Sequence, residues 1–255
     1  MKHLFHFVLL LSFGLLAGCK TNSTSSTPTT FDGSPVTIGT GSANSWIKTD
    51  ASGKVTSVGV TISDAALASI GTRDSMFELP APSGVSSIFK SIALDYATHD
   101  PAPYNKPHID PHFFLIVMAA RMGNMSGMDG MMPMNMMMPS GYTTDSMSEM
   151  MMGVHWMDTT ASEYHGTPFQ CAFDYGFSMG NLVFYETMCD KASLDGHKVI
   201  SNTIRQPMMM NGMTMSMPSS YAVTYDANAK VTNIELDGFA QMNFSSLNSF
   251  FELYE

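Results

Sequence analysis

Short apolar segments separated by turn residues run through the middle of the chain. Their spacing predicts a β-hairpin over Trp46–Thr49 and Lys54–Ile62. Ser63 then caps a short helix that is expected over Asp64–Ile70. Further strands are expected over Phe89–Tyr96, His112–Met118, Phe169–Tyr175, Leu182–Met188, Tyr221–Tyr225 and Val231–Leu236.

Most of these elements are strands that follow one another as hairpins, without a regular alternation of strand and helix. We therefore predict a mainly β fold, an antiparallel barrel or sandwich built from hairpins, with minor helices and Met-rich loop insertions. One of these helices is expected over Ser246–Tyr254, which has an apolar face. The β-rich domain is expected to cover residues 35–255, with the Met-rich insertions near 122–152 and 207–218.

Two cysteines flank the predicted hairpin over Phe169–Met188. Symmetric pairing of its strands about Gly180 places Cys171 opposite Cys189, so a cross-strand disulfide is expected between them. The alternative is two reduced thiols in the core. A disulfide would agree with an oxidising compartment.

The N-terminus has the features of an export signal. Lys2 precedes the apolar run Leu4–Ala17, which is too short to span a bilayer. The Leu-Ala-Gly-Cys sequence that ends at Cys19 resembles the lipobox of bacterial lipoproteins, in which the cysteine is acylated. Residues 1–18 are therefore expected to be a signal peptide, and Ser/Thr-rich residues 19–34 a disordered tether. An ordinary secretory signal followed by a chance cysteine is the alternative.

These features predict a protein of the bacterial cell envelope that Cys19 anchors through lipid, at the outer membrane and facing the periplasm. The chain of 255 residues has 12 basic and 22 acidic side chains, a formal net charge of -10. Because it also has no basic cluster, nucleic acid is excluded as a partner. Formation of a homo-oligomer is left open.

Methionine is concentrated in two tracts. There are 14 Met among residues 122–157 and 6 among residues 208–217, out of 26 in the chain. Interspersed Gly and Pro exclude a regular helix with a buried Met stripe in the first tract, so a core role is not expected there. Thioethers select Cu(I). The predicted soft ligands are Met131, Met132, Met134, Met136, Met137, Met138, Met213, Met215 and Met217. Sacrificial oxidation, or a low-complexity or adhesive loop without a ligand, are the alternatives.

A second set of candidate ligands lies around residue 110. On an extended strand His108, Asp110 and His112 project from one face. Together with His155 and Glu186 they would suit zinc, copper, iron or manganese. The alternative is a row of hydrogen-bonded polar side chains on an edge strand, which Pro111 favours.

Several segments resemble a known family. The resemblance is carried by Tyr96–Phe114, Met152–Asp158, Tyr175–Met188 and Tyr221–Phe239, in order along the chain. These segments are similar to the "TTHB two-ten"-like domain family, secreted bacterial proteins of unknown function. The resemblance implies a metal centre at the family's recurring positions, which here are His99, His108, Asp110, His112, His155 and Glu186. Pro111 and Thr187 depart from the family pattern.

The predicted function is that of a periplasm-facing lipoprotein that binds a transition metal ion. Copper is favoured because thioether and imidazole donors occur together, and zinc or iron are left open. The alternatives are a metal-dependent enzyme of unknown substrate and a Met-rich scavenger of oxidants.

Overall fold

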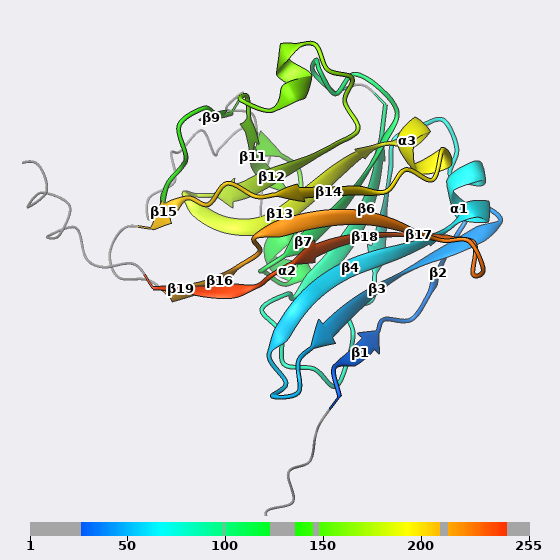
Figure 1. The fold of residues 1–255 in the computed structure, drawn as a ribbon, viewed down its shortest axis with the longest axis horizontal. Coiled ribbons are helices and arrows are strands. Elements are labelled where there is room, and N and C mark those ends of the chain that lie inside the picture. The colour runs from blue at the N-terminus through cyan, green and yellow to red at the C-terminus, as the bar shows by residue number, and fades with distance from the viewer. Residues whose placement is uncertain (1–26, 99, 123–135, 145–147, 210–213, 244–255) are drawn as a thin grey trace, which may run out of the picture.

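The computed structural model describes residues 27–98, 100–122, 136–144, 148–209 and 214–243. Two large antiparallel sheets pack as an open sandwich (Figure 1). The predicted mainly β fold is therefore confirmed, and of the two predicted arrangements the sandwich is the observed one. Among the described residues there is no helix that is both long and apolar enough to cross a membrane.

Sheet A combines strands from both ends of the described chain. Its strands are β1 (Thr29–Asp32), β2 (Val36–Ile38), β3 (Gly41–Thr49), β4 (Val55–Ser63), β14 (Ile200–Thr203), β17 (Ser220–Asp226) and β18 (Val231–Asp237). They follow the order β1-β3-β4-β18-β17-β14, and β2 pairs with β3. The expected hairpins over residues 46–62 and 221–236 both belong to this sheet.

Sheet B is formed by the middle of the chain. Its strands are β5 (Ser75–Leu79), β6 (Ser91–Ala97), β7 (His108–Phe114), β9 (Tyr142–Thr143), β10 (Ser148–Glu149), β11 (Gly153–Asp158), β12 (Cys171–Ser178) and β13 (Asn181–Asp190). They follow the order β10-β11-β12-β13-β7-β6-β5, and β9 pairs with β11.

The remaining elements are short. The helices are α1 (Asp64–Ser69), α2 (Met118–Arg121), α3 (Lys191–Asp195) and the 3-10 helix η1 (Ser162–His165). The predicted cap of α1 is confirmed, since the Ser63 hydroxyl accepts a hydrogen bond from the Ala66 N–H at 3.2 Å. Helices α1 and α3 lie side by side at one end of the sandwich (Figure 1). The helix expected over Ser246–Tyr254 lies outside the described residues.

The strand that carries the His-x-Asp-x-His sequence is central, not at an edge. β7 begins at His108, four residues before the predicted start, and it lies between β6 and β13. The prediction of an edge strand from Pro111 is therefore wrong. The pairing of β7 with β13 is interrupted between His112 and Ile109, because the proline in between has no N–H to donate.

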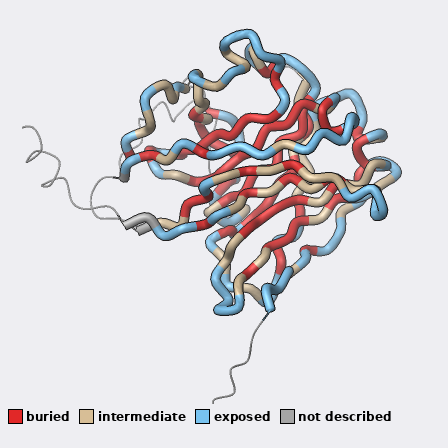
Figure 2. The backbone as a smooth tube through the Cα atoms, viewed as in Figure 1, coloured by how far each residue is buried: buried red, intermediate tan, exposed pale blue. Residues whose placement is uncertain are grey.

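The main core lies between the two sheets. Alternate residues of β7, such as Ile109 and Phe113, pack there against apolar side chains of sheet A. Figure 2 shows that the buried segments follow the strands, whereas the turns are exposed. The other alternate residues of β7 therefore point to the outer face of sheet B.

A disulfide joins β12 and β13, the two strands of one hairpin. Cys171 and Cys189 are paired in the register of β12 with β13, and their Cα atoms lie 4.1 Å apart. From Cys171 to Gly176 the observed register is symmetric about Gly180, as predicted. It shifts by one residue at a bulge after Gly176.

Removal of this disulfide by Cys171→Ala with Cys189→Ala is expected to lower the free energy of unfolding by about 3 kcal/mol, because the cross-link restricts the unfolded chain. Urea unfolding of the oxidised protein and of the double variant measures the difference. Reduced wild-type protein is the control and should resemble the variant. A loss below about 1 kcal/mol would show that the cross-link contributes little.

The two Met tracts meet in the structure. β8 (Met136–Met137) pairs with β15 (Met208–Met209), and β16 (Thr214–Met217) pairs with β19 (Ala240–Asn243). Met136 and Met217 are buried in the main core, and Met138 and Met215 pack against it. Met152 of the first tract is buried in a second cluster with Phe114 and Phe184. The expectation that this tract has no core role is therefore wrong for Met136 and Met152.

Only part of the predicted soft ligand set is described. Met137 is exposed on β8 opposite exposed Met208 of β15. The predicted ligands Met131, Met132, Met134 and Met213 lie outside the described residues. Copper binding by the tracts therefore stays a prediction.

Candidate metal centre

The outer face of sheet B carries a row of ionisable side chains. In the register of neighbouring strands, His112 of β7 lies opposite Glu186 of β13, and Glu186 lies opposite Asp174 of β12. His155 of β11 lies opposite Gly176, the next outward position on β12. Four neighbouring strands thus direct these groups to the same face.

Three of these side chains converge on one point. The Glu186 Oε2 atom lies 3.0 Å from His155 Nε2 and 3.4 Å from His112 Nε2. One ligand atom from each residue lies within 4.8 Å of the other two. Ligand atoms about 2.0–2.2 Å from an ion are about 3.3–3.6 Å apart at tetrahedral angles and about 3.0 Å apart at angles near 90°. The separations from Glu186 are therefore in the range found between ligands of one transition metal ion.

The orientation of His112 leaves a nitrogen available for such an ion. Its Nδ1 lies 3.0 Å from the Asp110 carbonyl oxygen, to which the Nδ1–H donates in the neutral tautomer. The lone pair is then on Nε2, which is buried and has no hydrogen-bond partner among the described residues. A backbone contact of this kind commonly orients a metal-binding histidine.

Aromatic rings hold the two histidines. The Phe184 ring centre lies 5.1 Å from that of His112 and 5.0 Å from that of His155. Phe114 stacks on His112 at 5.6 Å. A Cβ atom at Gly176 would lie 2.0 Å from the Phe184 ring, so glycine leaves the space that this ring occupies.

A cavity of about 70 Å³ adjoins the three side chains. Asp95, Asp110 and Asp174 line it together with His112, His155 and Glu186. Asp174 is 1% exposed, and neither of its carboxylate oxygens has a hydrogen-bond partner among the described residues. Buried carboxylates are costly without a partner, so this cavity is suited to a cation.

The three candidate ligands shift one another's pKa values. Burial alone would raise the pKa of Glu186, but His112 and His155 lower it to about 2. Burial alone would lower the pKa of His155, but the Glu186 carboxylate raises it to about 10. The pKa of His112 is lowered, chiefly by burial. Without a metal ion, an ion pair of His155 with Glu186 is therefore the favoured state.

The other carboxyl groups of the cavity are shifted in the opposite direction. Burial and then the charge of Glu186 raise the pKa of Asp95 to about 7. The same two causes raise the pKa values of Asp110 and Asp174 well above the usual range. These groups are therefore protonated more readily than ordinary carboxylates, and a bound cation would favour their ionised form.

No family model, curated protein or solved structure matches this chain. The family resemblance therefore stays a prediction.

His108 does not join the three converging side chains. Its Nε2 lies 3.2 Å from carboxylate oxygens of both Asp100 and Asp110, and its Nδ1 contacts the Lys106 carbonyl oxygen. Burial alone would lower the pKa of His108, but the Asp100 carboxylate and the carbonyl contact raise it. His108 therefore contacts the carboxylates of Asp100 and Asp110 beside the cavity.

The structure thus separates the predicted ligands into two groups. His112, His155 and Glu186 come together, whereas His108 and Asp110 form an adjacent ion pair. His99 lies outside the described residues. Sequence reasoning missed Asp95, Asp100 and Asp174. The predicted hairpin register already places Asp174 opposite Glu186, so this residue could have been found.

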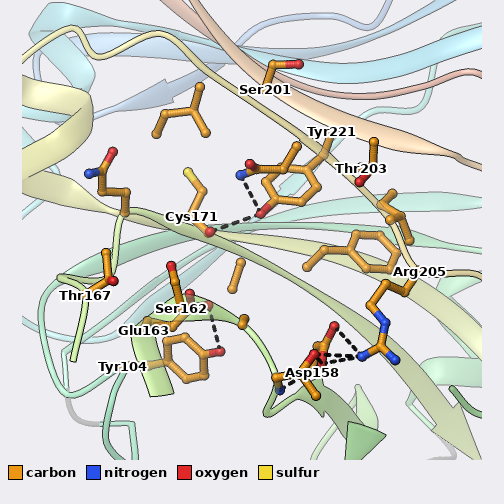
Figure 3. Close-up of a pocket in the computed structure, with 18 of the residues that line it drawn as sticks. Tyr104, Asp158, Ser162, Glu163, Thr167, Cys171, Ser201, Thr203, Arg205 and Tyr221 are labelled. Carbon is orange, nitrogen blue, oxygen red and sulfur yellow. Dashed lines mark hydrogen bonds and ion pairs between the residues drawn. The ribbon is translucent and has the colours of Figure 1, made fainter. Parts of the chain in front are cut away.

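A second cavity, of about 610 Å³, lies between the start of β12 and β14 (Figure 3). In it the Tyr221 hydroxyl donates to the Cys171 carbonyl oxygen at 3.0 Å, and Arg205 pairs with Asp158 at 2.9 Å. Tyr104 lines both cavities. The described residues of this groove include no group of three metal-binding side chains, so the candidate centre is the smaller cavity.

The metal-free protein is expected to lose stability as the pH rises from about 6.5 to about 10. His155 has a raised pKa of about 10 in the folded state, against 6.5 when unperturbed. Its contribution is therefore complete below pH 6.5 and is lost as the pH rises through 10. Thermal unfolding in a chelator at several pH values measures this loss.

The variant His155→Asn should show a smaller decline over this pH range, because it has no proton to lose. His197→Asn is the control, since that ring is partly exposed beside Tyr225 and away from the cavity. Equal declines in wild-type protein and in His155→Asn would contradict the assignment.

Proposed function

We propose that this chain is a lipid-anchored protein of the bacterial cell envelope that binds one transition metal ion, with copper favoured over zinc and iron. The observation that carries metal binding is the convergence of His112, His155 and Glu186 beside a buried cavity. Two imidazoles and one carboxylate form a common set of protein ligands for such ions. Three protein ligands leave one position open on a four-coordinate ion.

The composition of the chain supports the choice of copper. Thioethers are soft ligands, and 20 of the 26 Met lie in the two tracts over residues 122–157 and 208–217. The sequence that ends at Cys19 supports lipid attachment. Both statements rest on sequence pattern.

Titration with Co(II) tests metal binding, because the visible spectrum of Co(II) reports the number and type of its ligands. Wild-type protein is expected to bind one equivalent at this site, and His155→Ala should lose it. His197→Ala is the matched control and should bind as wild type does. Absence of a Co(II) complex in wild-type protein, or an unchanged complex in His155→Ala, would contradict the proposal.

A second candidate function is a metal-dependent enzyme, which the buried Asp174 favours. Its carboxyl group lines the cavity without a hydrogen-bond partner among the described residues, where it could exchange a proton with a small substrate. An open coordination position predicts that azide changes the spectrum of the Co(II) protein. An unchanged spectrum would favour a binding or storage role.

A further inference from the structure

The cavity has a sulfur-bearing side as well as a carboxylate side. Met152, Met157 and Met188 line it together with the three candidate ligands. None of the three was among the nine Met predicted by number as soft ligands, although Met152 and Met157 belong to the first Met tract. Their positions follow from the strands: Met157 is two residues after His155 on β11, and Met188 is two residues after Glu186 on β13. Side chains two residues apart share one face of a strand.

Met188 is placed close to the candidate ligands. It is buried and packs with Tyr104, Phe169 and Ala172 at the edge of the cavity. Residues two apart on a strand are about 7 Å apart at Cα, a distance that a flexible Met side chain can span.

Met157 is held from the other side. It lies opposite Asp174, which in turn lies opposite Glu186, so all three are in one row across the sheet. The Tyr164 hydroxyl donates to the Met157 sulfur at 3.6 Å. A thioether sulfur has a second lone pair, which remains available for a soft ion.

The two sides of the cavity favour different ions. Carboxylate and imidazole suit divalent ions, including zinc and Cu(II), whereas thioether sulfur selects Cu(I). Leucine would fill the apolar surroundings of Met188 as well as methionine does, and sulfur is the property that distinguishes them. A thioether ligand beside two histidines would therefore make the cavity prefer Cu(I), whereas a zinc site requires no thioether ligand.

We propose that Met157 and Met188 are soft ligands of the same centre, so that the cavity binds Cu(I) through imidazole and thioether donors. This inference rests on the proposed function, because it needs His112 and His155 to hold an ion. It goes further in assigning the selectivity to two residues outside the predicted ligand set. The nine Met residues predicted as soft ligands are then not required for Cu(I) binding at this centre.

X-ray absorption at the copper edge tests the proposal directly, with one equivalent of Cu(I) on the full chain. Wild-type protein is expected to show imidazole and sulfur in the first coordination shell together. Sulfur without imidazole would place Cu(I) on Met residues away from the cavity, and imidazole without sulfur would exclude Met157 and Met188. Either result overturns the proposal.

Substitution of the two residues provides an independent test. The double variant Met157→Leu with Met188→Leu is nearly isosteric and is expected to lower the Cu(I) affinity of the imidazole-containing site at least tenfold, measured against a chromophoric Cu(I) chelator. Its affinity for Co(II) should change less than threefold. Met179→Leu is the control, since Met179 is exposed at the turn between β12 and β13 and belongs neither to the cavity nor to the predicted soft ligands. It should change neither affinity.

The outcomes for the two proposals are distinguishable. Failure of wild-type protein to bind Co(II) counts against the proposed function. Normal Co(II) binding with an unchanged Cu(I) affinity in the double variant counts only against Met157 and Met188 as ligands. If the double variant does not fold, the absorption spectrum of wild-type protein still decides the question.

Discussion

The variant Glu186→Gln is expected to bind Co(II) or Cu(II) at least about 100-fold more weakly than wild-type protein. Glutamine keeps the size of the side chain but removes the charge that lies 3.0 Å from His155 and 3.4 Å from His112. An amide oxygen is a weaker ligand for a divalent ion than a carboxylate, and the loss should exceed the 10–100-fold typical of groups outside the ligand shell. Isothermal titration with each ion measures the change.

The same substitution should lower the pKa of His155. That pKa is raised to about 10 chiefly because the Glu186 charge outweighs the effect of burial. Without the charge, burial should bring the pKa below its ordinary value of about 6.5. Titration of the ring by NMR in a chelator follows this shift.

Glu149→Gln is the matched control for Glu186→Gln. Glu149 also lines the cavity, but it is exposed and is not one of the three converging groups. Its substitution should change the affinity less than about fivefold, since exposed charges interact weakly across water. Similar losses in the two variants would mean that total charge, not a ligand bond, determines metal binding.

The variant Gly176→Ala is expected to lower both stability and metal affinity. The new Cβ atom would lie 2.0 Å from the Phe184 ring, which must then move. Overpacking of this kind costs about 1–3 kcal/mol of unfolding free energy. Because the ring contacts both His112 and His155, its displacement should also weaken Co(II) binding at least tenfold.

A second substitution separates the packing effect from other effects at Gly176. Phe184→Leu removes the ring atoms that the new Cβ would meet, so the double variant should be more stable than the sum of the two single losses predicts. Urea unfolding and Co(II) titration of wild-type protein, the two single variants and the double variant measure this coupling. Additive losses, or a normal Co(II) affinity in Gly176→Ala, would show that the ring does not position the histidines.

Local periodicity accounts for the features that the sequence predicts well. Alternation along a strand places Glu186 and Cys189 on opposite faces of β13, and a symmetric hairpin register pairs Cys171 with Cys189. The shared face of His108, Asp110 and His112 follows from the same period of two. These inferences need no knowledge of distant contacts.

The features that the sequence predicts poorly depend on contacts between residues that are far apart in the chain. Pro111 suggests an edge strand, yet β7 is central because β13, more than 70 residues away, accepts an interrupted pairing beside it. His108 is about 13 Å from His112 at Cα along the strand and instead contacts Asp100, in the connection between β6 and β7. Neither the position of that connection nor the strand order is encoded in the local pattern.

The Met tracts show a similar limit. Composition alone cannot distinguish Met136, which is buried in the main core, from Met137, which is exposed beside it. The pairing of β8 with β15 determines which of the two is buried. The Met residues that line the cavity belong to strands or turns of sheet B and were identified through the fold.

Anomalous X-ray diffraction from crystals loaded with one equivalent of copper shows whether His112, His155 and Glu186 hold one ion. We expect one anomalous peak in the cavity on the outer face of sheet B, about 2.0–2.2 Å from His112 Nε2, His155 Nε2 and a Glu186 carboxylate oxygen. A copper peak elsewhere on the protein, with His155 still paired to Glu186, would contradict it.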